Sequence, residues 1–176
     1  MIRKEKFTFI TNKSKRELLY AIYSEVFNTL RTISQPTYFS CIFSLGSIIE
    51  TMTDELFERS NQKVWNKITS NQKLLGFVKK RFPRTRIHIY PNNSTLGPKI
   101  AALRILSEYG TSPVQRATVL QMIAIQKYRN LIHTNKGVRF RDSINRYVAQ
   151  NLFTWISHIA SDLWPKNVNK MLKVSP

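Results

Sequence analysis

An arginine and a histidine stand four positions apart in the segment KYRNLIHTNKG, residues 127–137. If this segment is helical, the side chains of Arg129 and His133 lie on one face and reach the same phosphate. Arginine is a planar, permanently charged phosphate clamp, and a neutral imidazole exchanges a proton at about pH 7. In RNA cleavage His133 would assist attack of the ribose 2′-hydroxyl or protonate the departing oxygen, while Arg129 stabilises the charge on phosphorus. The pair is therefore a candidate centre for metal-free RNA cleavage.

The same spacing has a purely structural alternative. Arg129 would then bond to a carboxylate on a helix, and His133 would lie near a helix C-terminus, where the helix dipole favours a cation. Spacing alone favours this structural alternative, and the surrounding sequence shifts the balance toward the functional one.

The chain is strongly basic. It has 176 residues, of which 28 are Lys or Arg and 10 are Asp or Glu, so the formal net charge is +18. Such an excess makes the compact state repel itself unless a polyanion neutralises it. Nucleic acid is the usual polyanion, and we expect RNA rather than DNA as the partner.

Two groups of basic residues stand out along the chain. The first places five cations within eight residues, close to Phe82, His88 and Tyr90, whose rings suit base stacking while the cations meet phosphates. The alternative for this group is a solvated helix end and loop. The second group surrounds the Arg129 and His133 pair. The predicted nucleic-acid-binding residues are Lys79, Lys80, Arg81, Arg84 and Arg86 in the first group and Lys127, Lys136, Arg139 and Arg141 in the second.

Four of the ten carboxylates fall within nine residues, as Glu50, Asp54, Glu55 and Glu58. Glu50 follows two isoleucines, and we expect it to face inward and orient Arg129 through a bidentate salt bridge. We expect the other three to form a solvated acidic stripe. A divalent metal on Glu50 and Asp54 is an alternative, but the sequence identifies no third ligand. We therefore expect no metal and no cofactor.

Location follows from what the sequence lacks. The longest nearly uncharged apolar stretch, residues 38–49, is shorter than the ~20 residues of a membrane-spanning helix. The N-terminal sequence MIRKEKFTFITNK has no apolar core of a secretory signal. The single cysteine, Cys41, lies in an apolar run and is expected to be a small buried hydrophobe. These features predict a cytoplasmic protein with no membrane partner.

Helical periods dominate the first half of the chain. Ser14 and Glu17 have capping-box spacing, which predicts a helix over residues 15–33. After Pro36 a second helix is expected, with a long apolar stripe and Gly46 at a close helix crossing. A third helix is expected over residues 63–81. The stripe of the second helix comprises Phe39, Ile42, Phe43, Leu45, Ile49, Met52, Leu56 and Phe57.

The second half of the chain begins with an irregular segment, residues 83–98, in which residues 86–90 are a possible extended piece. A short helix closed by Gly110 follows. Ser112, Pro113 and Gln115 predict the start of a long helix reaching about residue 134, and a last helix is expected from Asp142 until Pro165. The prediction is an all-α, up-and-down bundle of about five to six helices in a single domain, residues 1–176, with its helical body over residues 15–163.

Two segments resemble the HEPN superfamily (higher eukaryotes and prokaryotes nucleotide-binding domain). They are Arg129-Asn130-Leu131-Ile132-His133 near the end of a long helix, and FSLGSIIETMTDELF, residues 43–57, with a small residue followed by an acidic one. The resemblance implies an up-and-down helical bundle that dimerises so that two Arg/His motifs meet. It also implies metal-independent endoribonuclease activity, in a toxin–antitoxin or phage-defence system with a possible antitoxin partner. Arg129 would bind phosphate, Asn130 would be the polar partner, and His133 the catalytic imidazole.

One feature departs from the family pattern. HEPN proteins usually have four to six residues between the arginine and the histidine, whereas three intervene here. Some members of the family have lost catalysis. A non-catalytic, basic nucleic-acid-binding or dimerisation module is therefore the alternative function.

Overall fold

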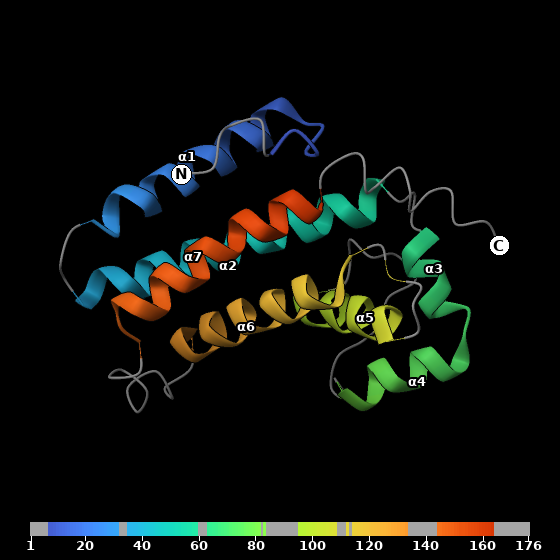
Figure 1. Ribbon diagram of the computed structural model, residues 1–176. Coiled ribbons are helices and arrows are strands. Elements are labelled where there is room, and N and C mark those ends of the chain that lie inside the picture. The colour runs from blue at the N-terminus through green and yellow to red at the C-terminus, as the bar shows by residue number, and fades with distance from the viewer. Residues whose placement is uncertain are drawn as a thin grey trace. The chain divides into compact units, whose positions relative to one another are not determined.

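The computed structural model describes residues 7–31, 35–59, 63–81, 83, 95–108, 112, 114–133 and 144–163 (Figure 1). This part of the chain contains seven α-helices and no strand, which confirms the predicted all-α class. None of the described helices is both long and apolar enough to cross a membrane. The helices are α1 (Lys13–Thr29), α2 (Gln35–Arg59), α3 (Lys63–Thr69), α4 (Gln72–Arg81), α5 (Leu96–Glu108), α6 (Arg116–His133) and α7 (Arg146–Asp162).

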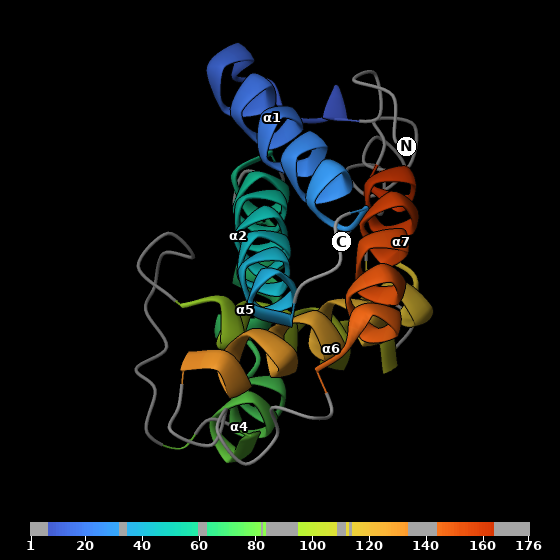
Figure 2. The same cartoon turned by 90° about the vertical axis from the view of Figure 1, so that its left-hand side faces the viewer.

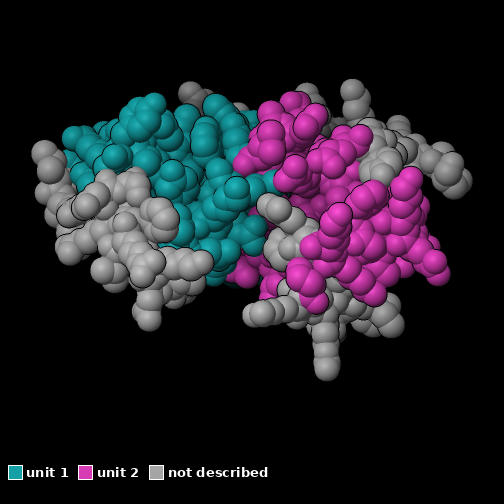
Figure 3. Space-filling model, turned by 90° about the horizontal axis from the view of Figure 1, so that it is seen from below, with its two compact units in different colours: residues 1–49, 121–161 teal, residues 50–120, 162–176 magenta. Residues whose placement is uncertain are grey.

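The chain forms two compact units, coloured separately in Figure 3. Unit 1 comprises residues 1–49 and 121–161, and unit 2 comprises residues 50–120 and 162–176. Each unit therefore combines segments that are distant in the sequence, and α2 and α6 each contribute to both. The organisation of the chain as a single domain stays a prediction.

Aromatic side chains join α1 to α7 in unit 1. Tyr23 of α1 stacks on Phe153 of α7 with ring centroids 4.4 Å apart, and Phe27 packs 5.9 Å from the same ring. Phe7 meets the edge of Tyr23 at 5.9 Å. Both helices are labelled in Figure 2. Aromatic pairs in such arrangements stabilise a core by about 0.5–1.5 kcal/mol beyond the area they bury. This contact fixes α1 against α7.

Unit 2 is built around α5, most of which is buried. Ile100, Leu103 and Leu106 are each at most 1% exposed. Phe57 and Trp65 pack edge to face at 5.5 Å and join the end of α2 to α3. Pro98 falls in the first turn of α5, where its missing N–H has no intrahelical partner to lose.

Asparagine caps three of the helices. Asn12, Asn71 and Asn145 accept hydrogen bonds from Lys15 N, Leu74 N and Val148 N at 3.0, 3.1 and 3.0 Å, respectively. Asparagine is among the best N-cap residues because its side-chain oxygen satisfies one of the orphan N–H groups. The predicted starts at Ser14 and Asp142 are therefore wrong: α1 begins after Asn12, and α7 begins at Arg146 after Asn145.

The helix predicted over residues 63–81 is two helices. Thr69 and Ser70 turn their hydroxyls back to the carbonyl of Asn66, at 3.4 and 2.6 Å. Asn71 then caps α4. Local side-chain bonds of this kind compete with continued helix, so the Thr-Ser-Asn sequence ends α3 and starts α4.

The start of α6 also differs from the prediction. The hydroxyl of Ser112 accepts from Val114 N at 3.1 Å and so stabilises a turn rather than the helix. The helix begins after Gln115, whose carbonyl accepts from Val119 N at 3.1 Å. The N–H of Gln115 donates to the carboxylate of Asp162 at 3.0 Å. An acidic residue from the other end of the chain therefore supplies the negative charge at this helix start.

Candidate functional site

Helix α6 carries the Arg129 and His133 motif. It runs from Arg116 to His133, so the two residues lie one turn apart in the same helix, as predicted. Met122 and Ile125 are fully buried on this helix, and Arg129 continues their face at helical spacing. Arg129 is half-buried and Asn130 is exposed. The side chain of His133 lies outside the described part of the structure.

The stem of Arg129 packs directly on the backbone of α2. A Cβ added at Gly46 would lie 2.9 Å from Cγ of Arg129 and 3.1 Å from its Cβ, and it would overlap Cδ. Any residue larger than glycine would therefore displace the arginine or the helix. This confirms the close approach predicted at Gly46. The Nε atom of Arg129 is buried at this contact.

The guanidinium of Arg129 lies over an aromatic ring of α2. Its Cζ is 5.5 Å from the centroid of Phe43, within the range of a cation–π interaction. Phe43 was predicted in the apolar stripe, but its side chain is 40% exposed. The helical period explains the difference, because Phe43 shares a face with the polar residues Ser47, Glu50 and Glu58, none of which is fully buried. The site thus combines the guanidinium of Arg129, whose stem is packed on α2, with the solvent-facing ring of Phe43.

Glu50 lies one turn after Gly46 on α2 and is half-buried. Its predicted bond to Arg129 stays a prediction. Of the acidic stripe predicted after Glu50, Glu58 is exposed, and the side chain of Asp54 is 38% exposed and also receives an ion pair. Glu55 is only 3% exposed, so the prediction of a solvated carboxylate is wrong for this residue. Helical rotation turns Glu55 toward the core, where its neighbours Leu56 and Phe57 are also buried.

The partner of Asp54 is a lysine that the sequence interpretation overlooked. Lys99 of α5 is 3% exposed, and its Nζ lies 2.6 Å from Oδ1 of Asp54, which is 38% exposed. Both residues belong to unit 2. A buried ammonium requires such a partner, because desolvating an unpaired charge is expensive. The signal available in the sequence was a single lysine inside the apolar segment LGPKIAAL.

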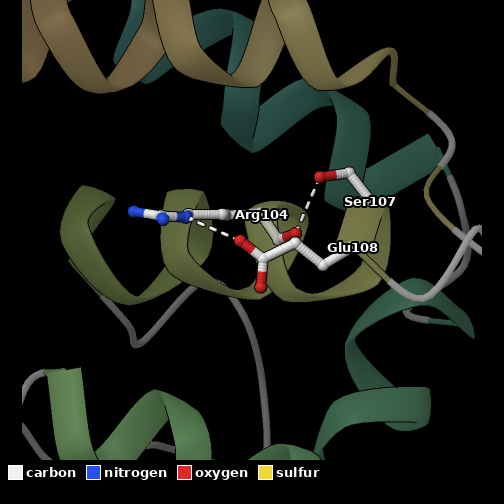
Figure 4. Close-up of polar contacts among 3 residues, drawn as sticks. All are labelled: Arg104, Ser107 and Glu108. Carbon is white, nitrogen blue, oxygen red and sulfur yellow. Dashed lines mark hydrogen bonds and ion pairs between the residues drawn. The ribbon is translucent and has the colours of Figure 1, made fainter.

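A second ion pair on α5 has a different environment (Figure 4). Nε of Arg104 donates to Oε1 of Glu108 at 3.0 Å, and the two side chains are 43% and 41% exposed. The hydroxyl of Ser107 donates to the carbonyl of Arg104 at 2.7 Å. Exposed pairs of this spacing stabilise a helix by only about 0.3–0.5 kcal/mol.

Part of the predicted nucleic-acid-binding set lies in the described helices. Lys79 and Lys80 are exposed at the end of α4, whose last residue is Arg81, and Lys127 is exposed on α6. These positions leave the ammonium groups of the three lysines accessible. The other predicted residues, Arg84, Arg86, Lys136, Arg139 and Arg141, lie outside the described residues, as do Phe82, His88 and Tyr90.

Cys41 is buried in α2, as predicted. Burial, together with the negative charge of Glu25 on α1, raises the pKa of its thiol from 9.0 to about 11. The neutral thiol therefore persists at pH 7, and Cys41 behaves as a core residue. In the described helices no group of three or more His, Cys, Asp or Glu side chains is arranged to hold a metal ion.

Comparison with protein-family models, with curated proteins and with solved structures found no match to this chain. The HEPN resemblance therefore rests on the motif residues themselves. Of these, Arg129 is the one whose surroundings the structure describes in most detail, through Gly46 and Phe43.

Proposed function

We propose that this protein is an HEPN-like RNA-acting protein that cleaves RNA without a metal ion. The observation that carries the proposal is the position of Arg129, one helical turn before His133. Its stem packs on Gly46, and its guanidinium lies over the ring of Phe43. A cation held in one position stabilises developing charge without reorganising during the reaction. The net charge of +18 supplies the attraction for a polyanionic substrate.

The proposed reaction is an internal phosphoryl transfer. The ribose 2′-oxygen attacks phosphorus and the bond to the 5′-oxygen breaks, which leaves a 2′,3′-cyclic phosphate and a 5′-hydroxyl. A neutral His133 accepts the proton of the 2′-hydroxyl, or a protonated His133 donates to the departing 5′-oxygen. Arg129 binds the non-bridging oxygens, while Asn130 and Glu50 position the phosphate and the guanidinium.

A homodimer suits this reaction, because one copy of His133 then acts as the general base and the other as the general acid. Activity of this type would belong to a toxin–antitoxin or phage-defence system, with an antitoxin as a possible protein partner. Both statements follow from the HEPN resemblance and are part of the proposal.

The test is cleavage of labelled RNA in the presence of EDTA. We expect His133→Ala and Arg129→Gln each to lower the cleavage rate by at least about 100-fold, with the fold and RNA binding of His133→Ala preserved. His158→Ala is the matched control, since His158 is an exposed histidine on α7 whose Nδ1 lies 3.4 Å from Nε2 of Gln121. Cleavage by His133→Ala at the wild-type rate would reject the assignment.

A non-catalytic nucleic-acid-binding function is the second candidate, favoured by the exposed lysines of α4. In that case RNA binds without cleavage, and affinity depends on Lys79 and Lys80 rather than on His133. Replacing both lysines by glutamine would then reduce the salt dependence of binding by about two counterions. The same variant distinguishes the two functions, because the nuclease assignment places the larger effect at His133.

A further inference from the structure

The ring of Phe43 is exposed on a polar face of α2, beside the cation that the proposed function assigns to phosphate binding. It is 40% exposed, although Cys41, Ile42 and Leu45 around it in the sequence are all at most 2% exposed. Phe43 thus borders solvent, whereas these neighbours belong to the core.

The contact between Gly46 and the stem of Arg129 also sets the position of the guanidinium relative to the ring of Phe43. Gly46 stands three positions after Phe43, on the adjacent side of the helix, and its missing side chain lets the arginine stem lie on the backbone. The guanidinium consequently stays 5.5 Å from the ring centroid. Because the guanidinium lies over one face of the ring, a base would stack on the other face, with the phosphate of the nucleotide directed to the cation.

We infer that Phe43 is a base-stacking platform and that the site takes a nucleotide from a single-stranded segment of RNA. The inference rests on the proposed function and specifies its substrate class. In double-stranded RNA the faces of the bases are occupied by their neighbours, whereas single strands offer unstacked bases to aromatic side chains. The ring selects the single strand by stacking, and Arg129 holds the phosphate next to the stacked base.

Affinity measurements on three probes test this assignment. The probes are a fluorescent single-stranded oligoribonucleotide, an abasic ribose-phosphate oligomer of equal length, and the same RNA sequence as a duplex. We expect Phe43→Leu to lower affinity for the single strand by roughly 5- to 150-fold, the range for loss of one stacked base. Affinity for the abasic oligomer and the duplex should not change, because neither offers a free base.

Two further variants define the chemistry. Phe43→Trp keeps an aromatic face and should restore single-strand affinity, which loss of general packing would not allow. Tyr147→Leu is the matched control, because Tyr147 is 72% exposed on α7 of the same unit and should leave binding to all three probes unchanged. Arg129→Gln should weaken binding to the single strand and to the abasic oligomer alike, with about one counterion fewer in the salt dependence.

The outcomes separate this inference from the proposed function. Equal single-strand affinity of Phe43→Leu and the wild type overturns the stacking role. A change in oligomeric state caused by Phe43→Leu, measured by sedimentation without an RNA-specific effect, also overturns it and assigns the ring to a contact between copies. RNA binding with the expected Phe43 dependence but no cleavage supports stacking and rejects the nuclease. Absence of RNA binding by the wild type rejects both.

Discussion

Two cations, one in each unit, are held against α2 by different means. Arg129 of unit 1 is half-buried, packs its stem on Gly46 and keeps its guanidinium over the exposed ring of Phe43. Lys99 of unit 2 is 3% exposed and bonds the carboxylate of Asp54 at 2.6 Å. An ion pair thus holds the ammonium of Lys99, and packing on Gly46 holds the stem of Arg129.

The difference suggests separate roles for the two residues. Removing one partner of a largely buried ion pair lowers stability, because the other partner is left as an uncompensated charge. The guanidinium of an arginine is planar, and its fork of donors matches the geometry of a phosphate. We therefore expect changes at Lys99 and Asp54 to affect stability, and changes around Arg129 to affect the action on RNA.

The largest effect on stability is expected for Asp54→Asn. The substitution leaves the buried ammonium of Lys99 without a counterion and should lower the free energy of unfolding by about 3 kcal/mol, or the Tm by roughly 6–12 °C. Lys99→Met should be milder, because Asp54 is 38% exposed and water can solvate it. Urea unfolding of the two variants and of the double variant measures the coupling between them.

The exposed pair on the same helix is the control for this measurement. Arg104→Gln removes the bond to Glu108, and we expect a loss below about 0.5 kcal/mol. If Asp54→Asn is no more destabilising than Arg104→Gln, burial does not distinguish the two pairs and the comparison of the two cations fails.

The same substitution at two helical glycines sharpens the comparison further. Gly46→Ala introduces a Cβ that overlaps the stem of Arg129, and we expect RNA cleavage to fall at least about 10-fold because the guanidinium is displaced. The better helix propensity of alanine, about 1 kcal/mol, should offset part of the steric cost to stability. Cleavage kinetics and urea unfolding of this variant separate the two effects.

Gly76→Ala in α4 is the matched control. No atom lies within 4 Å of a Cβ built at Gly76, so the variant should gain about 0.5–1 kcal/mol of stability and keep full activity. Full activity of Gly46→Ala would show that the position of Arg129 is unimportant to the reaction, contrary to the role assigned to it.

The smallest effect concerns Cys41, which is buried in unit 1. Since the pKa of its thiol is raised from 9.0 to about 11, the thiolate fraction at pH 8 should be about 100-fold lower than in the unfolded chain. The stabilising contribution of the neutral thiol is complete below pH 9 and is lost as the pH rises toward 11. Reaction with a thiol reagent at pH 8, native against urea-unfolded, measures the difference. Equal rates would contradict burial of this residue.

The sequence alone determined the helical class and much of the site. Apolar periods predicted most of the buried face of α2, because helical spacing is a local property of the chain. Gly46 in the middle of a helix correctly indicated a close approach, and the spacing of Arg129 and His133 placed them one turn apart in α6. These patterns do not show which residue of another helix each side chain contacts.

Tertiary structure decided the features that depend on such neighbours. Only packing determines that Phe43 faces solvent beside Arg129, that Lys99 is buried on Asp54, and that Asp162 stabilises the start of α6. Each pair joins residues far apart in the sequence. The physical reason is that burial and charge pairing are set by which helix faces meet, whereas periodicity describes one helix at a time.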